Sequence, residues 1–541
     1  MGGWDTIPAR LLPVSILREG NLDLDEFPWL RRLGPEPYFL KATPGGHLRS
    51  RYPIAIPVLI TPLYAPALWW LEHNQVSDDD VRFRLAVVVM ERVGAAAIAS
   101  ASVALVFLAL CRLTRPTLAA GIATAYAVGT NTWSTSSQAL YQHGPAELAL
   151  AGLSLCLLAD DTRRTVIAAG FFAAIGVLAR PTMGVFAVCA VLFVWWERPR
   201  HRLAFAALTV LGGVALIAYN VAFFGHGLGG YADIVRFFRW PNLTRLTGLL
   251  ISPSRGLLIY TPAAALSLPQ MLRGRGAAHA WLKYAAAGVV GYLLLYTCFG
   301  GWWGGYAYGP RFLTDTLPAL AILAAPTVER LWQNPKGRAL IVGLTTWGVV
   351  VQAIGVYCDD RSWDALPVPV DRQKGRLWEW GDPQILRALQ VGWQGTELAG
   401  VLWQAFTDPR PVRLRELAND EVVGSITATP PLRWARRARA PLDLMVTNNS
   451  AVAWPAFSDY GLLMVQLVYI WWRDGQSLAG DGGFIKLPRN VSAGESQVVH
   501  TLIDTPRLPG NYELEIVITQ PLDFEKGLRG SASERIPVRI E

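Results

Sequence analysis

The sequence predicts an α-helical polytopic membrane protein with about ten spans, followed by a C-terminal β-sandwich. Three observations predict this fold class. About ten apolar stretches are joined by short loops that alternate between arginine-rich and arginine-poor. Hydrophobic residues make up 52% of the chain, charged residues only 17%, and Trp occurs 22 times. The last part of the chain changes to short β-branched runs. This composition excludes a soluble enzyme with one large core.

The candidate spans form one transmembrane domain over residues 93–357. They cover 93–111, 116–130, 145–159, 165–179, 182–196, 203–224, 256–269, 283–299, 313–327 and 338–357. Several are shorter than the ~20 residues that cross a hydrocarbon core, so their ends must extend into flanking polar residues. Arginine-rich loops are expected in the cytoplasm, which places residues 1–92, 131–144, 225–255, 300–312 and 358–541 outside. We therefore expect a multi-pass protein of the cytoplasmic (inner) membrane with an extracytoplasmic C-terminal domain.

Residues 1–92 are expected to form the first outer loop. Within it, Pro53–Leu71 is apolar but contains four prolines, each of which removes a backbone donor. We expect a broken helix that lies on or dips into the membrane; a true span is the alternative and would reverse the side of residues 1–52. Because residues 1–52 are polar and no leading apolar segment precedes them, we expect ~20 further apolar residues to be encoded upstream of Met1. A stop codon there would refute this.

The chain after residue 357 is expected to lie outside the membrane in two parts. Residues 358–440 form a connecting region, in which 377–390 is expected to be a short amphipathic helix on the membrane surface. Residues 441–541 are expected to form an Ig-like accessory β-sandwich. Its strands are predicted at the alternating or β-branched runs 441–450, 461–472, 495–504, 511–520 and 534–540.

The net charge of +8 is explained by the membrane topology. Lys and Arg fall in short turns between apolar segments, where the positive-inside rule expects them, so we predict membrane lipid and no nucleic acid as a partner. The five cysteines show neither a disulfide framework nor a CxxC metal motif. No cofactor is predicted from this pattern.

Carboxylates near the outer face are candidate site residues: Asp5, Asp25 and Glu26 as catalytic groups, and Glu147 and Asp315 as substrate-binding groups. Asp5, Asp25 and Glu26 lie in the first outer loop, while Glu147 and Asp315 lie within spans. A charge inside a span costs roughly 2.5 to 3.5 kcal/mol, so Glu147 and Asp315 are expected to face a cavity or a partner. Hydration at the membrane interface is the alternative.

His143 and Glu147 are four residues apart, which places both on one face of a helix that begins early. Such a pair would suit a substrate phosphate or a divalent metal. Two ligands alone are a weak metal motif, so the metal is left as an open alternative.

Three arginines lie at outer ends of spans beside Gly or Pro. They are Arg180 in ARPT, Arg255 in SPSRG and Arg311 in YGPRF. Guanidinium groups bind phosphate with two parallel hydrogen bonds, so we predict that the three bind a lipid phosphate or pyrophosphate. Interfacial snorkelling to lipid headgroups is the alternative for each one.

The segment FGGWWGGYAYGPR, residues 299–311, combines glycines with aromatic residues in an outer turn. Glycine allows close backbone approach, and exposed aromatic faces are surfaces on which a sugar ring stacks. We predict Trp302, Trp303 and Tyr308 as substrate-binding residues. An ordinary aromatic belt at the membrane interface is the alternative.

Several blocks of the chain together resemble bacterial membrane glycosyltransferases of the GT-C superfamily. In chain order the blocks are GWDTIPARLLPVSILREGNLDLDEF, RSRYPIAIPVLITPLYAP, GTNTWSTSSQALYQHGPAEL, ARPT, LLISPSRGLLIYTP and GGWWGGYAYGPRFLTDTLPAL. The resemblance runs from about residue 3 to residue 320, and RLWEWGDPQI extends it. These are recurring blocks rather than strict signatures, so they indicate the class and not the substrate.

The resemblance implies a GT-C-like fold, an outer-face active site and a polyprenyl-phosphate sugar as donor. It also implies that a carboxylate in the first outer loop is the general base. That residue is Asp5 here, with Asp25 and Glu26 as the next candidates. The expected activity is a hexosyl- or pentosyltransferase of the cell envelope whose acceptor is a glycan, a lipid or a protein.

The residues fit such a mechanism independently. Asp5 would remove the proton of the acceptor hydroxyl, while the three arginines stabilise the phosphate leaving group. No P-loop or dinucleotide fingerprint is present, and a lipid phosphate needs none. Direct displacement predicts inversion at the anomeric carbon. The alternatives are a polysaccharide polymerase or ligase and a lipid-linked-glycan transporter or flippase, although internal repeats typical of transporters are not seen.

Overall fold

The structure is a computed structural model that describes residues 3–34, 36–273, 279–359, 362–366, 368–393, 396–408, 410–428, 433–436, 439–478, 482–506, 508–523 and 527–541. Contacts divide the chain into two compact units. Unit 1 comprises Met1–Glu26, Tyr38–Ala65 and Met90–Gln394, and unit 2 comprises Phe27–Pro37, Pro66–Val89 and Gly395–Glu541. Residues 358–394, which the sequence placed in a separate connecting region, therefore belong to unit 1.

Unit 1 is helical, and two of its helices, α2 and α3, belong partly to each unit. The helices are α1 (Ile7–Arg18), α2 (Ala55–His73), α3 (Val81–Leu110), α4 (Pro116–Val128), α5 (His143–Leu158), α6 (Arg163–Ala179), α7 (Gly184–Glu197), α8 (Arg202–Phe224), α9 (Ala232–Val235), α10 (Leu243–Ile251), α11 (Leu257–Tyr260), α12 (Leu268–Leu272), α13 (Ala280–Cys298), α14 (Leu317–Leu331), α15 (Pro335–Tyr357), α16 (Ser362–Ala365) and α17 (Gln384–Val391). Short turns of other helix types position the site: η1 (Trp4–Thr6), the π-helix η3 (Thr132–Ser136), η4 (Pro181–Met183), η7 (Pro262–Ser267) and η9 (Arg311–Thr316). Strands β1 (Leu40–Ala42) and β2 (Leu48–Ser50) pair antiparallel.

Among the described residues, five helical segments are long and apolar enough to span a membrane. They are Ala55–His73, Val81–Leu110, Pro199–Phe224, Arg311–Leu331 and Pro335–Tyr357. Three shorter apolar helices cover Pro116–Val128, His143–Leu158 and Pro181–Glu197. The expected count of about ten spans is therefore not reached by length and composition. The range 256–269 is divided between α11 and η7, because Pro262 has no backbone N–H to continue a helix.

The proline-rich segment Pro53–Leu71 differs from the expectation of a broken helix. It forms one continuous helix, α2, with Pro57, Pro62 and Pro66 inside it. Pro57 lies in the first turn, where a missing N–H costs little. Leu59 and Trp69 on this helix are exposed, as lipid-facing residues would be. The alternative of a true span, which the sequence left open, fits this helix by its length and composition.

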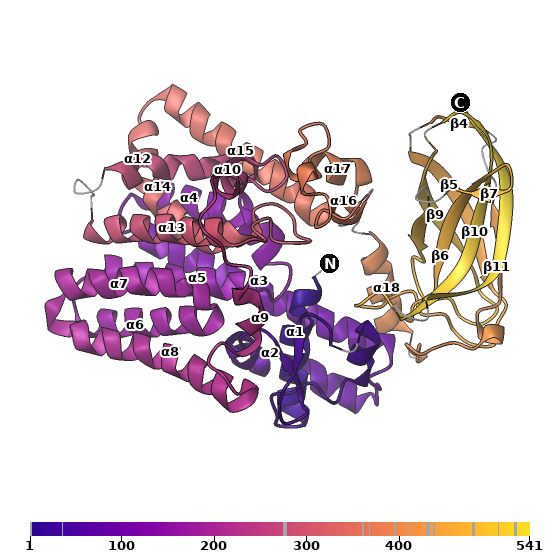
Figure 1. The fold of residues 1–541 in the computed structure, drawn as a ribbon, viewed down its shortest axis with the longest axis horizontal. Helices are drawn as coiled ribbons and strands as arrows, with labels where there is room; N and C mark the ends of the chain where they lie inside the picture. The colour runs from indigo at the N-terminus through magenta and orange to yellow at the C-terminus, as the bar shows by residue number, and fades with distance from the viewer. Residues whose placement is uncertain are drawn as a thin grey trace. The chain divides into compact units, whose positions relative to one another are not determined.

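The central helices of unit 1 lie alongside one another (Figure 1). Helix α6 packs against α5, α7 and α8, and α7 packs against α13. Small residues allow this close approach: a Cβ added at Gly212 of α8 would lie 2.7 Å from the Cα atom of Ala174 in α6. The site described below lies where the N-terminal end of α5, the end of α6 and the segment before α14 meet.

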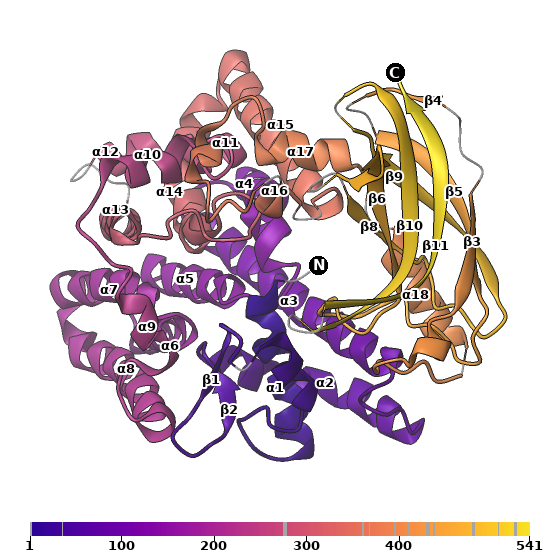
Figure 2. The ribbon, with the colours of Figure 1, turned by 45° about the vertical axis from the view of Figure 1, so that its right-hand side comes forward.

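Unit 2 contains two β-sheets that lie face to face (Figure 2). The larger has the order β4-β11-β10-β6-β7, with β8 also paired to β6, and the smaller has the order β3-β5-β9. The strands are β3 (Gly424–Ala428), β4 (Arg433–Trp434), β5 (Arg439–Asn448), β6 (Gln466–Arg473), β7 (Gln476–Ser477), β8 (Gly483–Lys486), β9 (Ser496–Asp504), β10 (Gly510–Asp523) and β11 (Gly527–Ile540), and helix α18 (Thr396–Thr407) precedes them.

The predicted β-region is confirmed, since each of the five predicted runs overlaps a strand. The alternation of buried and exposed residues along β5 shows why: Leu442, Leu444 and Val446 are buried while their neighbours are not. Across the two sheets, the indole of Trp471 on β6 donates a hydrogen bond to the carbonyl of Asp504 on β9 at 2.9 Å. One pairing is parallel, between β11 and β4, so the sandwich is not fully antiparallel.

Candidate functional site

Asp5 accepts hydrogen bonds from three different segments. It lies in η1, and its Oδ1 accepts from the hydroxyl groups of Tyr38 at 2.7 Å and Tyr52 at 3.1 Å. Its Oδ2 accepts from the guanidinium of Arg311. Gly3 holds this turn in place, because its N–H donates to the Tyr141 hydroxyl at 2.7 Å and a Cβ there would collide with that oxygen. The N-terminal segment is thus joined to η9, the segment before α14.

Arg311 connects Asp5 to a second, fully buried group. Its Nη2 pairs with Asp5, and its Nε donates to Nε2 of His143 at 3.3 Å. The guanidinium also lies 4.8 Å from the ring centroid of Tyr141. The side chains of Arg311 and Asp5 are each 16% exposed. Nη1 of Arg311 makes no hydrogen bond to any residue that the structure describes, so this guanidinium retains a donor for a ligand.

Beneath this pair lies a buried cluster of His143, Arg180 and Asp315. Nδ1 of His143 lies 2.6 Å from Asp315 Oδ1, and Nε of Arg180 lies 2.8 Å from Asp315 Oδ2. Arg180 also donates through Nη2 to the Tyr296 hydroxyl at 2.7 Å, and Tyr292 donates to Asp315. A ring that donates at Nδ1 and accepts at Nε2 is neutral imidazole. The charges of Arg180 and Asp315 then balance within the cluster.

The ionisation of Asp5 follows from its partners. Burial raises the pKa of the Asp5 carboxyl, but the charge of Arg311 and the hydrogen bonds from Tyr38, Arg311 and Tyr52 together outweigh burial, and the pKa lies below its ordinary value. Asp5 is therefore an ionised carboxylate near neutral pH and a weak base while these donors hold it.

Further charges lie beside Tyr38. Arg51 donates through Nη1 to the Tyr38 carbonyl at 2.8 Å and through Nη2 to Asp233 at 2.8 Å. Lys41 lies 3.2 Å from the same Asp233 carboxylate. Cations exceed anions by one in this group, so the region around Asp5 favours an anionic ligand.

Arg255 is not brought together with Arg180 and Arg311. It is buried and donates to the carbonyl groups of Trp303 at 2.9 Å, Ser254 at 2.7 Å and Gly305 at 3.2 Å, and it pairs with Asp364. It also donates to the Gln384 side chain. Its nitrogens are thus engaged by protein groups, as are those of Arg180. Of the three predicted arginines, Arg311 is the one that keeps a nitrogen without a partner among the described residues.

The aromatic loop does not expose rings to a ligand. Trp302, Trp303 and Tyr308 are all buried. The Trp303 indole donates to Asp371 at 2.8 Å, and the Tyr308 hydroxyl donates to the carbonyl of Val351 at 2.9 Å. The glycines of this loop allow these rings to pack inward. These three side chains therefore do not provide the exposed stacking faces that were predicted for a sugar.

Asp25 and Glu26 lie apart from the Asp5 network. Asp25 accepts from the Leu48 N–H at 2.8 Å and lies 2.7 Å from Nδ1 of His47. Ligand atoms of Asp23, Asp25 and His47 lie within 4.8 Å of one another, a geometry that a metal ion requires. Arg49, however, lies 3.6 Å from Asp23 and already supplies a positive charge there. Nδ1 of His143 faces Asp315, and the metal-like cluster found among the described residues includes neither His143 nor Glu147.

Glu147 is fully buried one turn after His143. Its Oε1 accepts from the Thr132 hydroxyl at 2.8 Å, and it does not hydrogen-bond to Asp5, Arg180 or Arg311 in the described part of the chain.

The tyrosines of the site were missed by sequence reasoning. Tyr292 and Tyr296 are four residues apart within apolar α13, a spacing that places two phenols on one helical face. That spacing was the available signal.

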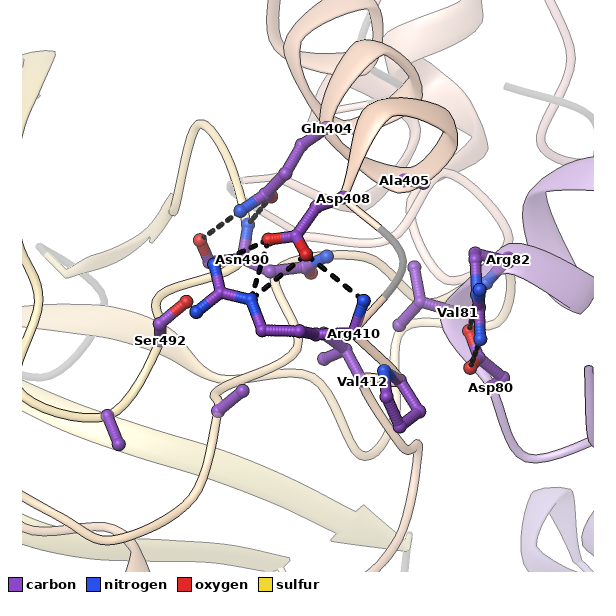
Figure 3. Close-up of a pocket in the computed structure, with 13 residues that line it drawn as sticks. Asp80, Val81, Arg82, Gln404, Ala405, Asp408, Arg410, Val412, Asn490 and Ser492 are labelled. Carbon is purple, nitrogen blue, oxygen red and sulfur yellow. Dashed lines mark hydrogen bonds and ion pairs between the residues drawn. The ribbon is translucent and has the colours of Figure 1, made fainter.

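Unit 2 contains a separate cavity of about 230 Å³ (Figure 3). Gln404 and Asn490 close one side through mutual hydrogen bonds of 2.9 and 2.7 Å. Arg410 pairs with Asp408, with Nε to Oδ1 at 2.9 Å. The described residues that line the cavity include none of the predicted site residues.

The structure thus defines a helical protein with five candidate membrane spans and a cluster of carboxylate, imidazole, guanidinium and phenol groups. No model of a known protein family matches the chain. No curated protein matches it. Among solved structures, the chain is matched to the Pseudomonas fluorescens alkylpurine DNA glycosylase AlkC bound to DNA containing an abasic site analogue, with 12% identity over 82% of this chain and 96% of that chain. The TM-score is 0.17.

These comparisons correct two expectations from the sequence. The matched protein is a DNA glycosylase and not a membrane glycosyltransferase, so sugar transfer from a polyprenyl-phosphate donor is not carried forward as the function. The same match is to a protein bound to DNA, so the exclusion of nucleic acid as a partner is not carried forward either. At a TM-score of 0.17 the likeness carries no argument that this chain shares the fold of AlkC or binds DNA.

Proposed function

We propose that unit 1 is an enzyme that binds the phosphate group of an amphiphilic substrate at Arg311 and uses Asp5 as its acid–base group. One observation carries this proposal. Arg311 lies between Asp5 and His143, is partly exposed, and has a nitrogen with no hydrogen-bond partner in the described residues. A guanidinium with an open donor is suited to a phosphate oxygen.

The proposed chemistry depends on competition between Asp5 and a substrate phosphate for the guanidinium of Arg311. A phosphate that binds this guanidinium weakens its pairing with Asp5, and loss of a neighbouring cation raises the basicity of a carboxylate. Asp5 then accepts the proton of an attacking hydroxyl group or water molecule. Arg311 stabilises the negative charge that develops on the phosphate, while the buried cluster of His143, Arg180 and Asp315 holds Arg311 in position. The reaction class is group transfer or hydrolysis at a phosphate-bearing substrate.

A membrane location of unit 1 supports the proposal that its substrate is amphiphilic. Five helical segments meet the length and composition of spans, which brings unit 1 next to lipid. We further propose that this membrane is the cytoplasmic membrane, with the Asp5 site at one of its two surfaces. The sequence blocks resembling the GT-C superfamily agree with a site at this position, and membership of that superfamily stays a proposal.

The test measures ligand binding to the full chain in detergent. A long-chain alkyl phosphate should raise the melting temperature of the wild type, whereas the alcohol of equal chain length should not. Arg311→Ala should weaken the phosphate's binding by about 10- to 100-fold, because hydrogen bonds to charged groups contribute about 1.5–3 kcal/mol. Arg245→Ala is the matched control, since Arg245 is a half-buried arginine of α10 that donates to the carbonyls of Thr297 and Cys298.

Three outcomes oppose the proposal. Equal binding of the alkyl phosphate and the alcohol would mean that the protein recognises the alkyl group and not the phosphate. Unchanged phosphate binding by Arg311→Ala would place the phosphate elsewhere. Binding of a short DNA duplex that competes with the alkyl phosphate would assign the anion site to nucleic acid.

A further inference from the structure

A carboxyl group outside the proposed mechanism is buried in unit 1 without a cation. Glu147, in the second turn of α5, has no exposed surface. Its Oε1 accepts one hydrogen bond, from the Thr132 hydroxyl at 2.8 Å. Its Oε2 is buried and has no hydrogen-bond partner in the described part of the chain. The Ser136 hydroxyl lies beside the carboxyl as a further donor, and no cation pairs with either oxygen in the described part of the chain.

Hydroxyl groups, not charges, surround this carboxyl. The sequence TNTWSTSS places Thr130, Thr132 and Ser136 at and around the π-helix η3, which packs against the start of α5. Thr130 donates to Thr132 at 3.0 Å, and Thr132 donates to Glu147. The Ser136 hydroxyl lies beside Glu147 and is also buried without a hydrogen-bond partner among described residues.

The charged groups near Glu147 oppose its ionisation. The titratable groups that face it are Tyr126 of α4, whose hydroxyl is paired with Ser102 at 2.8 Å, and Asp315 of η9. Asp315 is itself paired with Arg180 and His143, so Arg180 is not available to Glu147. A like charge on Asp315 and the absence of a cationic partner both favour a neutral carboxyl, because an unpaired buried carboxylate is strongly unfavourable.

We propose that Glu147 is a proton-binding site, held as a carboxylic acid inside the helical unit. The bound proton lies on Oε2, which gives this oxygen a donor to share with the Ser136 hydroxyl. The hydroxyl of Thr132 donates to the other carboxyl oxygen, Oε1. Loss of this proton would place a second negative charge near Asp315. Protonation of Glu147 is therefore coupled to the cluster that holds Arg311.

Infrared spectroscopy of the full chain distinguishes a carboxylic acid from a carboxylate. The difference between wild type and Glu147→Gln should show the carbonyl band of a protonated carboxyl group at neutral pH, shifted in heavy water. Glu91→Gln is the matched control: Glu91 is equally buried in α3 but lies 3.3 Å from Arg10. Its difference spectrum should show carboxylate bands. Carboxylate bands for Glu147 as well would overturn the proposal.

A second measurement tests whether Glu147 binds a proton or a metal cation. It uses the wild-type protein and does not need the Glu147→Gln variant. Replacement of sodium by choline should leave the wild-type melting temperature unchanged; a sodium-dependent rise would make Glu147 a cation site and refute the proposal. If Glu147→Gln does not fold, wild type with isotope-labelled glutamate is examined at pH 8, about four units above the ordinary glutamate pKa. A residual labelled carboxylic-acid band supports the proposal, and its absence refutes it.

Discussion

Substitution of Asp315 by Asn tests whether the buried cluster of unit 1 is an obligatory charge pair. Asp315 has no exposed surface and accepts from Arg180 Nε at 2.8 Å, from His143 at 2.6 Å and from Tyr292. Asp315→Asn keeps the volume but removes the carboxylate that pairs with Arg180 in the described part of the chain, leaving a buried guanidinium uncompensated. Breaking a buried pair by removing one partner costs about 3–5 kcal/mol.

A surface pair of the same chemistry provides the control. His47 and Asp25, also in unit 1, lie 2.7 Å apart, but their side chains are 53% and 35% exposed. Asp25→Asn should cost at most about 1 kcal/mol, because solvent screens such pairs. The two variants thus compare a buried carboxylate that pairs with Arg180 and His143 and a more exposed carboxylate that pairs with His47.

Thiol-reactive fluorescence during heating measures the difference. All five cysteines, Cys111, Cys156, Cys189, Cys298 and Cys358, are free, partly buried and within unit 1, so a dye that labels exposed thiols reports the unfolding of this unit. At about 2 °C per kcal/mol, Asp315→Asn should lower the melting temperature by roughly 6–10 °C and Asp25→Asn by about 2 °C or less. Equal shifts for the two variants would refute the reasoning from burial.

Three further predictions concern Arg311, Asp5 and the glycines of the loop that precedes Arg311. Arg311→Lys keeps the charge but loses the planar fork, so alkyl-phosphate binding measured by titration should weaken by about 10-fold; affinity equal to wild type would contradict this. The lowered pKa of Asp5 means that its contribution to stability is present above about pH 4 and is lost as pH falls through the folded-state pKa, so the melting temperature should fall more between pH 5 and pH 2 in wild type than in Asp5→Asn. Gly309→Ala should destabilise by more than Gly305→Ala in thermal unfolding. Both glycines have positive φ, worth about 1–2 kcal/mol, but a Cβ at Gly309 would also lie 2.6 Å from the Tyr260 ring.

The helices and strands could largely be predicted because hydropathy and alternation are local properties. The runs Leu442–Val446 and Leu514–Ile518 are apolar with partial alternation, and they form part of strands β5 and β10. The continuity of α2 could not be predicted, because three prolines in a helix are tolerated or not according to packing that the sequence does not display. The same limit applies to the number of spans.

The candidate site could be predicted in part. Residue chemistry indicated that Asp5, Arg180, Arg311 and Asp315 would approach one another, since buried charges require partners. The separate place of Arg255 could not be inferred, because its side-chain partners Asp364 and Gln384 come from a segment more than a hundred residues away. The tyrosine donors to Asp5 were equally hidden, as a phenol in an apolar context serves packing or hydrogen bonding with the same sequence pattern.

The ion pair of Arg255 and Asp364 has a consequence for how the protein can be divided. Asp364 and Gln384 come after α15, the last long apolar helix, yet both hold an arginine that precedes α11. A chain shortened at residue 357 would keep every candidate span but strand a guanidinium in the interior. Trimmed or chimeric versions of this protein should therefore keep the chain through α17, and any exchange of the β-domain should be made after that helix.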